Sequence, residues 1–130
     1  MQLYETLIRE NQIDIFGHVN NATYLEFFEA ARWDILEAKG FGFEKIKSLG
    51  QGPVILEAHL KFIKEVKARD LISIKTEPMH FKGKIGEMKQ YMYKPNQELA
   101  AELRLVFGLF DLRARQLMLP TPEWVEALTT

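Results

Sequence analysis

Apolar residues recur at helical spacing between residues 21 and 39, and this pattern predicts one long helix. One stripe of the helix consists of Tyr24, Phe27, Phe28, Ala31 and Ile35. Leu25, Trp33 and Leu36 add apolar surface on its other faces. Because little of its circumference is polar, the helix is expected to be largely wrapped by protein.

The segments on either side of this helix carry clear boundary signals. Asn20 or Asn21 can cap its start, and Gly40 can end its last turn. Residues 11–20 read as a loop with a turn at Gly17, and residues 43–49 read as a short second helix.

After residue 53 the period of the apolar pattern changes from helical to two. This alternation predicts a half-buried strand over residues 54–63, with Val54, Leu56, Ala58, Leu60 and Phe62 on one face. Further strands are expected at residues 71–81, 86–94 and 98–111, with a weaker one at 2–10 and a terminal helix at 123–128. In the last strand one face is shared by Leu99, Ala101, Leu103, Leu105, Phe107 and Leu109. This order predicts a single α+β domain over residues 1–130, with an antiparallel sheet curled around the helix.

Composition narrows the classes of function. The 130 residues fit one domain, and an apolar fraction of 47% is enough to build a core. The net charge of -1 gives no global attraction to nucleic acid. The absence of cysteine excludes disulfides, thiolate metal sites and cysteine nucleophiles. No charged leader or long apolar run is present, so we expect a soluble cytoplasmic protein without a membrane span.

Elimination leaves carboxylate chemistry assisted by the backbone. Neither Ser48 nor Ser73 lies in a nucleophile elbow, the three histidines lack zinc-ligand spacing, and no glycine-rich phosphate loop occurs. We therefore expect neither a metal nor a cofactor. Asp14 lies just before the long helix, whose first amides can stabilise an oxyanion. Its carboxylate can attack an acyl carbonyl or deprotonate a water, and the sequence leaves both roles open.

The residues around Asp14 resemble the signature of the 4-hydroxybenzoyl-CoA thioesterase family, and of related acyl-CoA and acyl-ACP thioesterases. That pattern is roughly D-x-x-G-H-V-N-N-x-x-Y followed by a helical E-x-A-R. Here it is matched from Asp14 to Tyr24 and again from Glu29 to Arg32. Two departures are Asn11-Gln12-Ile13-Asp14, where many relatives have E-D-T-D, and Gly83, which thins the basic cluster.

The resemblance implies a hot-dog fold, a homodimer or homotetramer, and a thioester substrate carried by CoA or acyl carrier protein. It implies that Asp14 is the catalytic carboxylate and that the backbone N–H of Asn21 polarises the carbonyl. His18 is a third candidate at the site. Tyr24, Lys82 and Lys84 are candidate contacts to substrate or CoA phosphates.

Each candidate also has an ordinary structural interpretation. Asp14 can simply cap its own turn, and Tyr24 can be a packing residue. His18 can bond the backbone, and the two lysines can be solvated turn residues. Glu29 and Arg32 are spaced to pair along the helix, and we favour that structural role.

Two other functions stay open. A hot-dog hydratase or dehydratase would usually show D-x-N-P-x-H spacing, which differs from the separation of Asp14 and His18. A non-catalytic module that binds acyl carriers is the second alternative, and the intact GHVNN stretch argues against it. The acyl group, the carrier and the arrangement of subunits are not set by the sequence.

Overall fold

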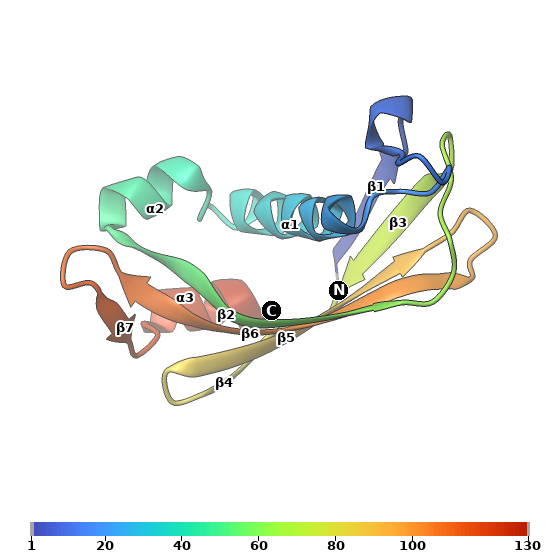
Figure 1. The fold of residues 1–130 in the computed structure, drawn as a ribbon. Coiled ribbons are helices and arrows are strands. Elements are labelled where there is room, and N and C mark those ends of the chain that lie inside the picture. The colour runs from blue at the N-terminus through green and yellow to red at the C-terminus, as the bar shows by residue number, and fades with distance from the viewer. Residues whose placement is uncertain (1, 130) are drawn as a thin grey trace.

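The computed structural model describes residues 2–129 and shows a curved antiparallel sheet wrapped around one long helix (Figure 1). The helices are α1 (Asn21–Ala38), α2 (Phe43–Leu49) and α3 (Pro122–Thr129), and a single turn of 3-10 helix, η1 (Glu10–Gln12), precedes α1. The strands are β1 (Gln2–Leu7), β2 (Gln51–Phe62), β3 (Leu71–Thr76), β4 (His80–Lys82), β5 (Ile85–Tyr93), β6 (Leu99–Asp111) and β7 (Gln116–Met118).

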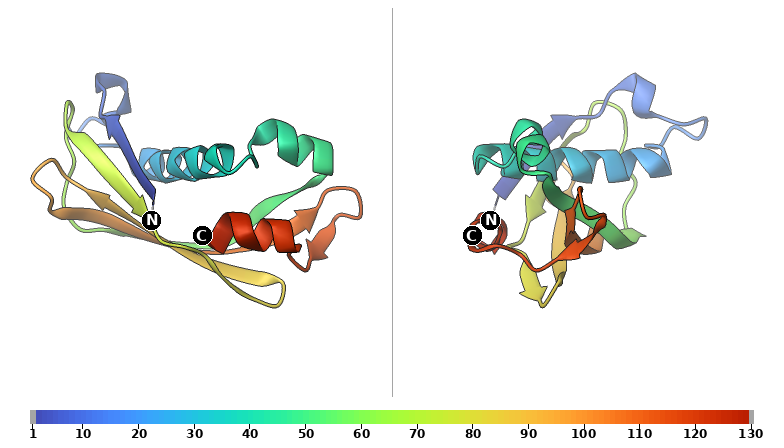
Figure 2. Two further views of the ribbon diagram at one scale, coloured as in Figure 1. Left: turned by 180° about the vertical axis from the view of Figure 1, so that it is seen from behind. Right: turned by 90° about the vertical axis from the view of Figure 1, so that its left-hand side faces the viewer.

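The strands form one sheet in the order β1-β3-β5-β6-β2, with β4 paired to β5 and β7 paired to β6. Every pair is antiparallel. The sheet bends around α1, which lies on its concave side (Figures 1 and 2). This is the α+β arrangement that the sequence predicted, and β2 forms one edge of it.

The apolar stripe of α1 faces the sheet, as predicted. Its members are no more than 8% exposed, and all of them except Ile35 belong to one core with the inward side chains of β3, β5 and β6. Burying a Phe or Leu side chain stabilises a fold by ~1.5–3 kcal/mol. Leu25 and Trp33, however, remain 42% and 39% exposed. The expectation that the helix is largely wrapped is therefore wrong for a single chain, which leaves one side of α1 open.

A buried polar link fixes α1 on the sheet. The side chain of Gln90 on β5 is fully buried, and its Nε2 donates to the carbonyl of Phe28 (3.1 Å) and to Oγ1 of Thr76 (3.0 Å). Its Oε1 accepts a hydrogen bond from Nη1 of Arg32 at 3.0 Å. Burial lowers the pKa of Arg32, and the charge of Glu29 opposes that shift. Within residues 2–129 no ion pair joins Arg32 to Glu29, so Gln90 replaces the partner expected from the sequence.

The strand expected at 71–81 is two strands, because Pro78 interrupts it. Proline has no N–H to donate to a ladder. The chain leaves the sheet there, and the N–H of Met79 donates to the carbonyl of Leu128 in α3 (3.0 Å). The sequence also missed β7, which folds back on the end of β6 and pairs Gln116 with Asp111.

A β-bulge in β2 changes which residues face the helix. Ile55 pairs with Phe107, but Glu57 pairs with Val106, so Leu56 is the extra residue. Paired residues point to the same side of a sheet, and Phe107 is a core residue. Ile55 therefore shares the inward face, whereas the strict alternation predicted Leu56 there.

We predict that Gln90→Leu lowers the free energy of unfolding by ~1–3 kcal/mol, because it leaves Arg32 and Thr76 without their buried partner. The measurement is urea unfolding followed by circular dichroism. Gln116→Leu, at an exposed site on β7, is the matched control and should change stability by less than ~0.5 kcal/mol. Equal effects of the two substitutions would contradict the proposed importance of the link.

Candidate active site

The loop before α1 is a small hairpin closed by an isolated bridge between Ile13 and Val19. The N–H of Asp14 donates to the carbonyl of His18 (2.8 Å), and the N–H of Gly17 donates to the carbonyl of Asp14 (3.1 Å). Gly17 has a φ of 80°, a conformation that costs little only for glycine. The tip residues Ile15 and Phe16 are 93% and 76% exposed.

The carboxylate of Asp14 serves its own loop through only one oxygen. Oδ1 accepts from the N–H of Phe16 (2.9 Å) and of His18 (3.3 Å). This is the turn-capping role that the sequence offered as the alternative to catalysis. Among the described residues, none donates a hydrogen bond to Oδ2. The side chain is half-buried, so one oxygen is fixed in place while the other is free for chemistry.

The start of α1 leaves an amide free beside this loop. Asn20 is the N-cap, and its side chain accepts from the N–H of Ala22 at 2.9 Å. Its carbonyl accepts from the N–H of Thr23 at 2.9 Å. Asn21 is the first helical residue, and no acceptor for its N–H occurs within the described chain. A free amide at a helix N-terminus is suited to binding a developing negative charge.

A cavity of about 200 Å³ adjoins this free amide. His18, Asn21 and Tyr24 line it together with Val19, Phe62, Ile63, Lys64 and Glu65. Tyr24 is 4% exposed and stacks edge-on against Phe62 with ring centroids 5.0 Å apart, and burial raises its pKa. Asp14 lies next to this cavity through its hydrogen bond to His18 but does not itself line it.

Glu65 is a site residue that the sequence analysis missed. Its carboxylate lies 2.7 Å from Nε2 of His18 and 3.5 Å from Nζ of Lys67. The backbone reinforces this contact, because the N–H of Val19 donates to the carbonyl of Val66. The segment after β2 thus holds the Asp14 loop against α1. No sequence motif signals a pairing between residues so far apart in the chain.

Lys82 and Lys84 are not brought to this site within one chain. They flank Gly83 in the turn between β4 and β5, which lies at the opposite end of the sheet from the start of α1 (Figures 1 and 2).

Two further properties concern ligands and membranes. The part of the chain described here contains no group of three or more His, Asp or Glu side chains arranged to hold a metal ion. Over the same residues, no helix is both long and apolar enough to cross a membrane.

The model of the thioesterase-like superfamily matches residues 8–128. The long-chain acyl-CoA thioesterase FadM of Escherichia coli is 29% identical over 110 residues, which cover 84% of this chain and 83% of that protein. The chloroplastic acyl-acyl carrier protein thioesterase ATL3 of Arabidopsis thaliana is 25% identical over 90% of this chain, which spans 62% of that relative. The crystal structure of YbaW, a probable thioesterase from Escherichia coli, superposes with a TM-score of 0.88 at 25% identity and covers all of both chains.

The two roles of Asp14 in the loop can be separated by substitution. Asn keeps an oxygen that accepts from the amides of Phe16 and His18, whereas Ala removes it. We predict that Asp14→Ala destabilises the loop by ~0.5–2 kcal/mol and that Asp14→Asn changes it little. Hydrogen exchange of the two amides measures this local stability. If both variants exchange alike, the Oδ1 contacts do not hold the loop.

Proposed function

The chain belongs to the thioesterase-like superfamily and is a thioester hydrolase of the hot-dog fold, and we propose that it cleaves acyl-CoA through Asp14 and the amide of Asn21. The observation that carries this proposal is the pairing of a free carboxylate oxygen with a free helix-start amide at one loop. Oδ2 of Asp14 and the N–H of Asn21 both lack partners among the described residues. Each is of the kind that acyl transfer requires.

In the proposed mechanism the thioester carbonyl accepts a hydrogen bond from the N–H of Asn21. Charge that develops on this oxygen in the transition state is stabilised by that amide and by the helix dipole. The carboxylate of Asp14 either attacks the carbonyl carbon or removes a proton from the attacking water. The carbonyl then re-forms and expels CoA, whose sulfur takes up a proton. On the general-base route this step gives the free acid directly. On the nucleophilic route it leaves an anhydride between the acyl group and Asp14, which water hydrolyses to the free acid and the regenerated carboxylate.

His18 takes a supporting role in this proposal. The contact with Glu65 orients the imidazole at the cavity wall, and the backbone N–H of His18 donates to Oδ1 of Asp14. The imidazole therefore links the loop to Glu65 and contributes a polar surface for the substrate, while the backbone of His18 holds Asp14. Tyr24, which is buried against Phe62, contributes packing and an apolar wall near the thioester.

The acyl group has a natural path along α1. Two cavities of about 230 and 200 Å³ lie between α1 and β2, and both are lined by Glu29, Arg32 and Ile55. Their shared lining makes them one groove, whose other walls include Leu25, Trp33 and Pro53. Most of the residues that line the groove are apolar, as an acyl chain requires, and its charged residues are Glu26, Glu29 and Arg32. The name of the bacterial relative supports a long-chain acyl-CoA substrate, and that of the plant relative keeps acyl carrier protein as the second carrier.

We also propose that the protein works as a homodimer or homotetramer in the cytoplasm. The free edge of β2 can pair with the same strand of a second copy, and exposed apolar residues gather beside it. They are Leu25, Trp33, Ile55, Leu56, Phe62 and Ile63. A second copy would cover these residues, close the groove and carry its own Lys82 and Lys84 toward the CoA phosphates.

We expect Asp14→Asn to lower kcat by ~10²–10⁴-fold, because it removes the charged oxygen and keeps the loop. The assay follows thiol release from palmitoyl-CoA. Asp34→Asn, at an exposed position on α1 away from the loop, is the matched control and should keep wild-type activity. A well-folded Asp14→Asn enzyme with wild-type kcat would remove Asp14 from the mechanism. Enoyl-CoA hydration by the wild type would favour the hydratase alternative.

The subunit interface has its own test. Trp33→Glu places a charge among the exposed apolar residues beside β2, so it should shift the protein from dimer to monomer in analytical ultracentrifugation. Leu3→Glu, on the distant strand β1 where Leu3 is 58% exposed, serves as the control and should leave assembly unchanged. Retention of the dimer by Trp33→Glu would place the interface elsewhere.

A further inference from the structure

The convex face of the sheet carries a row of basic side chains with no role in the hydrolysis described above. Arg104 on β6 pairs with His59 on β2 and with Lys89 on β5, so three basic residues lie side by side across three strands. Like charges placed directly opposite one another destabilise a sheet. Repulsion between neighbouring positive charges in such a row lowers the stability of the fold, unless a bound anion neutralises them.

The carboxylates nearby satisfy only part of this charge. Glu87 reaches Nη1 of Arg104 at 3.3 Å, and the neighbouring row pairs Lys61 with Glu102 at 3.6 Å. Within residues 2–129 the side chains of Lys89 and His59 have no hydrogen-bonding or ionic partner. The row therefore holds two unpaired basic groups beside a half-exposed arginine.

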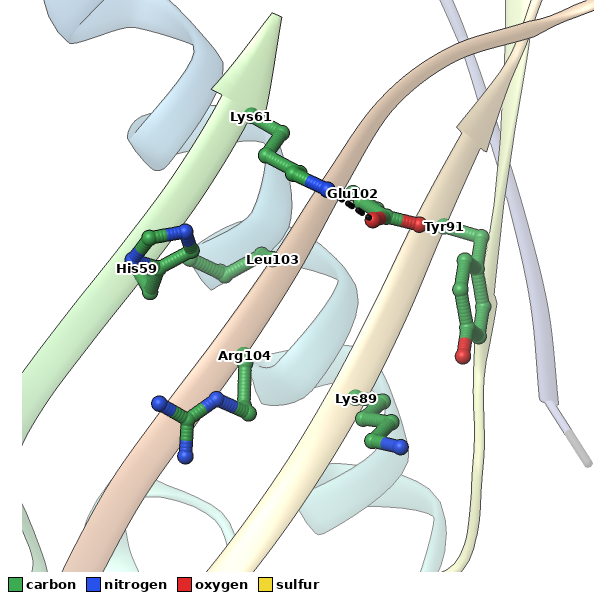
Figure 3. Close-up of a pocket in the computed structure, with 7 residues that line it drawn as sticks. All are labelled: His59, Lys61, Lys89, Tyr91, Glu102, Leu103 and Arg104. Atoms are coloured by element: carbon green, nitrogen blue, oxygen red, sulfur yellow. Dashed lines mark ion pairs between the residues drawn. The ribbon is translucent and has the colours of Figure 1, made fainter.

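These residues surround a hollow rather than a flat surface. A cavity of about 290 Å³ is lined by the three members of the row and by Lys61, Tyr91, Glu102 and Leu103 (Figure 3). Figure 3 shows the polar side chains rising from β2, β6 and β5 on the side of the sheet away from α1, whereas Leu103 belongs to the core on the other side. Lys61, Lys89 and Arg104 bring three positive charges to the hollow, and Glu102 brings one negative charge. The hollow therefore has a local excess of positive charge even when His59 is counted as neutral.

We propose that this convex hollow binds a small molecule bearing phosphate groups, with Lys89 and Arg104 as its main contacts. The planar guanidinium of Arg104 can hold two phosphate oxygens, and the mobile ammonium of Lys89 can reach a third. His59 adds a donor at the side of β2. The sheet separates this site from Asp14 in the same chain, so a ligand here does not occupy the thioester site.

Binding can be tested by isothermal titration calorimetry at low ionic strength, with inorganic pyrophosphate and adenosine 3′,5′-bisphosphate as separate probes. The wild type should bind at least one probe saturably, with an affinity that falls as salt rises. Arg104→Gln and Lys89→Gln should each weaken binding by about tenfold or more, because each removes a charge-assisted contact. Preference for the nucleotide would identify a CoA-type headgroup, whereas equal affinities would identify free phosphate.

The control is Lys47→Gln, which removes the same charge from exposed α2 and should bind like the wild type. Asp14→Asn should also bind normally, which separates this proposal from the hydrolytic one. In the absence of anion, Lys89→Gln should unfold at a temperature equal to or above that of the wild type. Absence of saturable binding, equal loss in Lys47→Gln, or loss of self-association instead of anion affinity would overturn the proposal.

Discussion

The seating of α1 on the concave face of the sheet is the constraint on which the rest of the structure depends. An apolar stripe provides most of the attraction, and the buried side chain of Gln90 makes the seating specific by bonding Phe28, Arg32 and Thr76 at once. Apolar contact alone allows a helix to slide or rotate, whereas a satisfied buried amide accepts one position. That position leaves the first turn of α1 open beside the Asp14 loop.

The sequence predicted the features that follow from periodicity and local capping. The stripe of α1 and the inward face of β6 from Ala101 to Leu109 could be read from residue spacing, because a helix or strand repeats its environment at a fixed period. The prediction that Leu99 shares that face is wrong, because a bulge at Ala100 pairs Leu99 with Tyr93. The sequence offered Asn20 or Asn21 as the cap of α1, and the structure uses Asn20. The break at Pro78 and the bulge at Leu56 change the period of the apolar pattern locally, and β7 is too short to show any period. These departures depend on pairing with distant strands, which spacing alone does not encode.

The site shows the same division between local and distant information. The hairpin that carries Asp14 could be predicted from a motif, since its hydrogen bonds join residues within a few positions of one another. Glu65 beside His18 and Gln90 beside Arg32 could not be, because the fold alone brings them together. Lys82 and Lys84 lie at the other end of the sheet from the start of α1, a placement that the spacing of residues along the chain does not reveal.

The two faces of the sheet are thus suited to different chemistry. The concave side carries α1, with the free amide and the free carboxylate oxygen at its start and a separate groove between α1 and β2. The convex side carries a basic row with no helix over it (Figures 1 and 3). The central claim is that the thioester carbonyl lies at the start of α1. A crystal structure with a non-hydrolysable acyl-CoA analogue tests it most directly. We expect the carbonyl oxygen at hydrogen-bond distance, about 3 Å, from the amide nitrogen of Asn21, with Oδ2 of Asp14 facing the carbonyl carbon or a water. An analogue bound with its carbonyl remote from both groups would contradict the account.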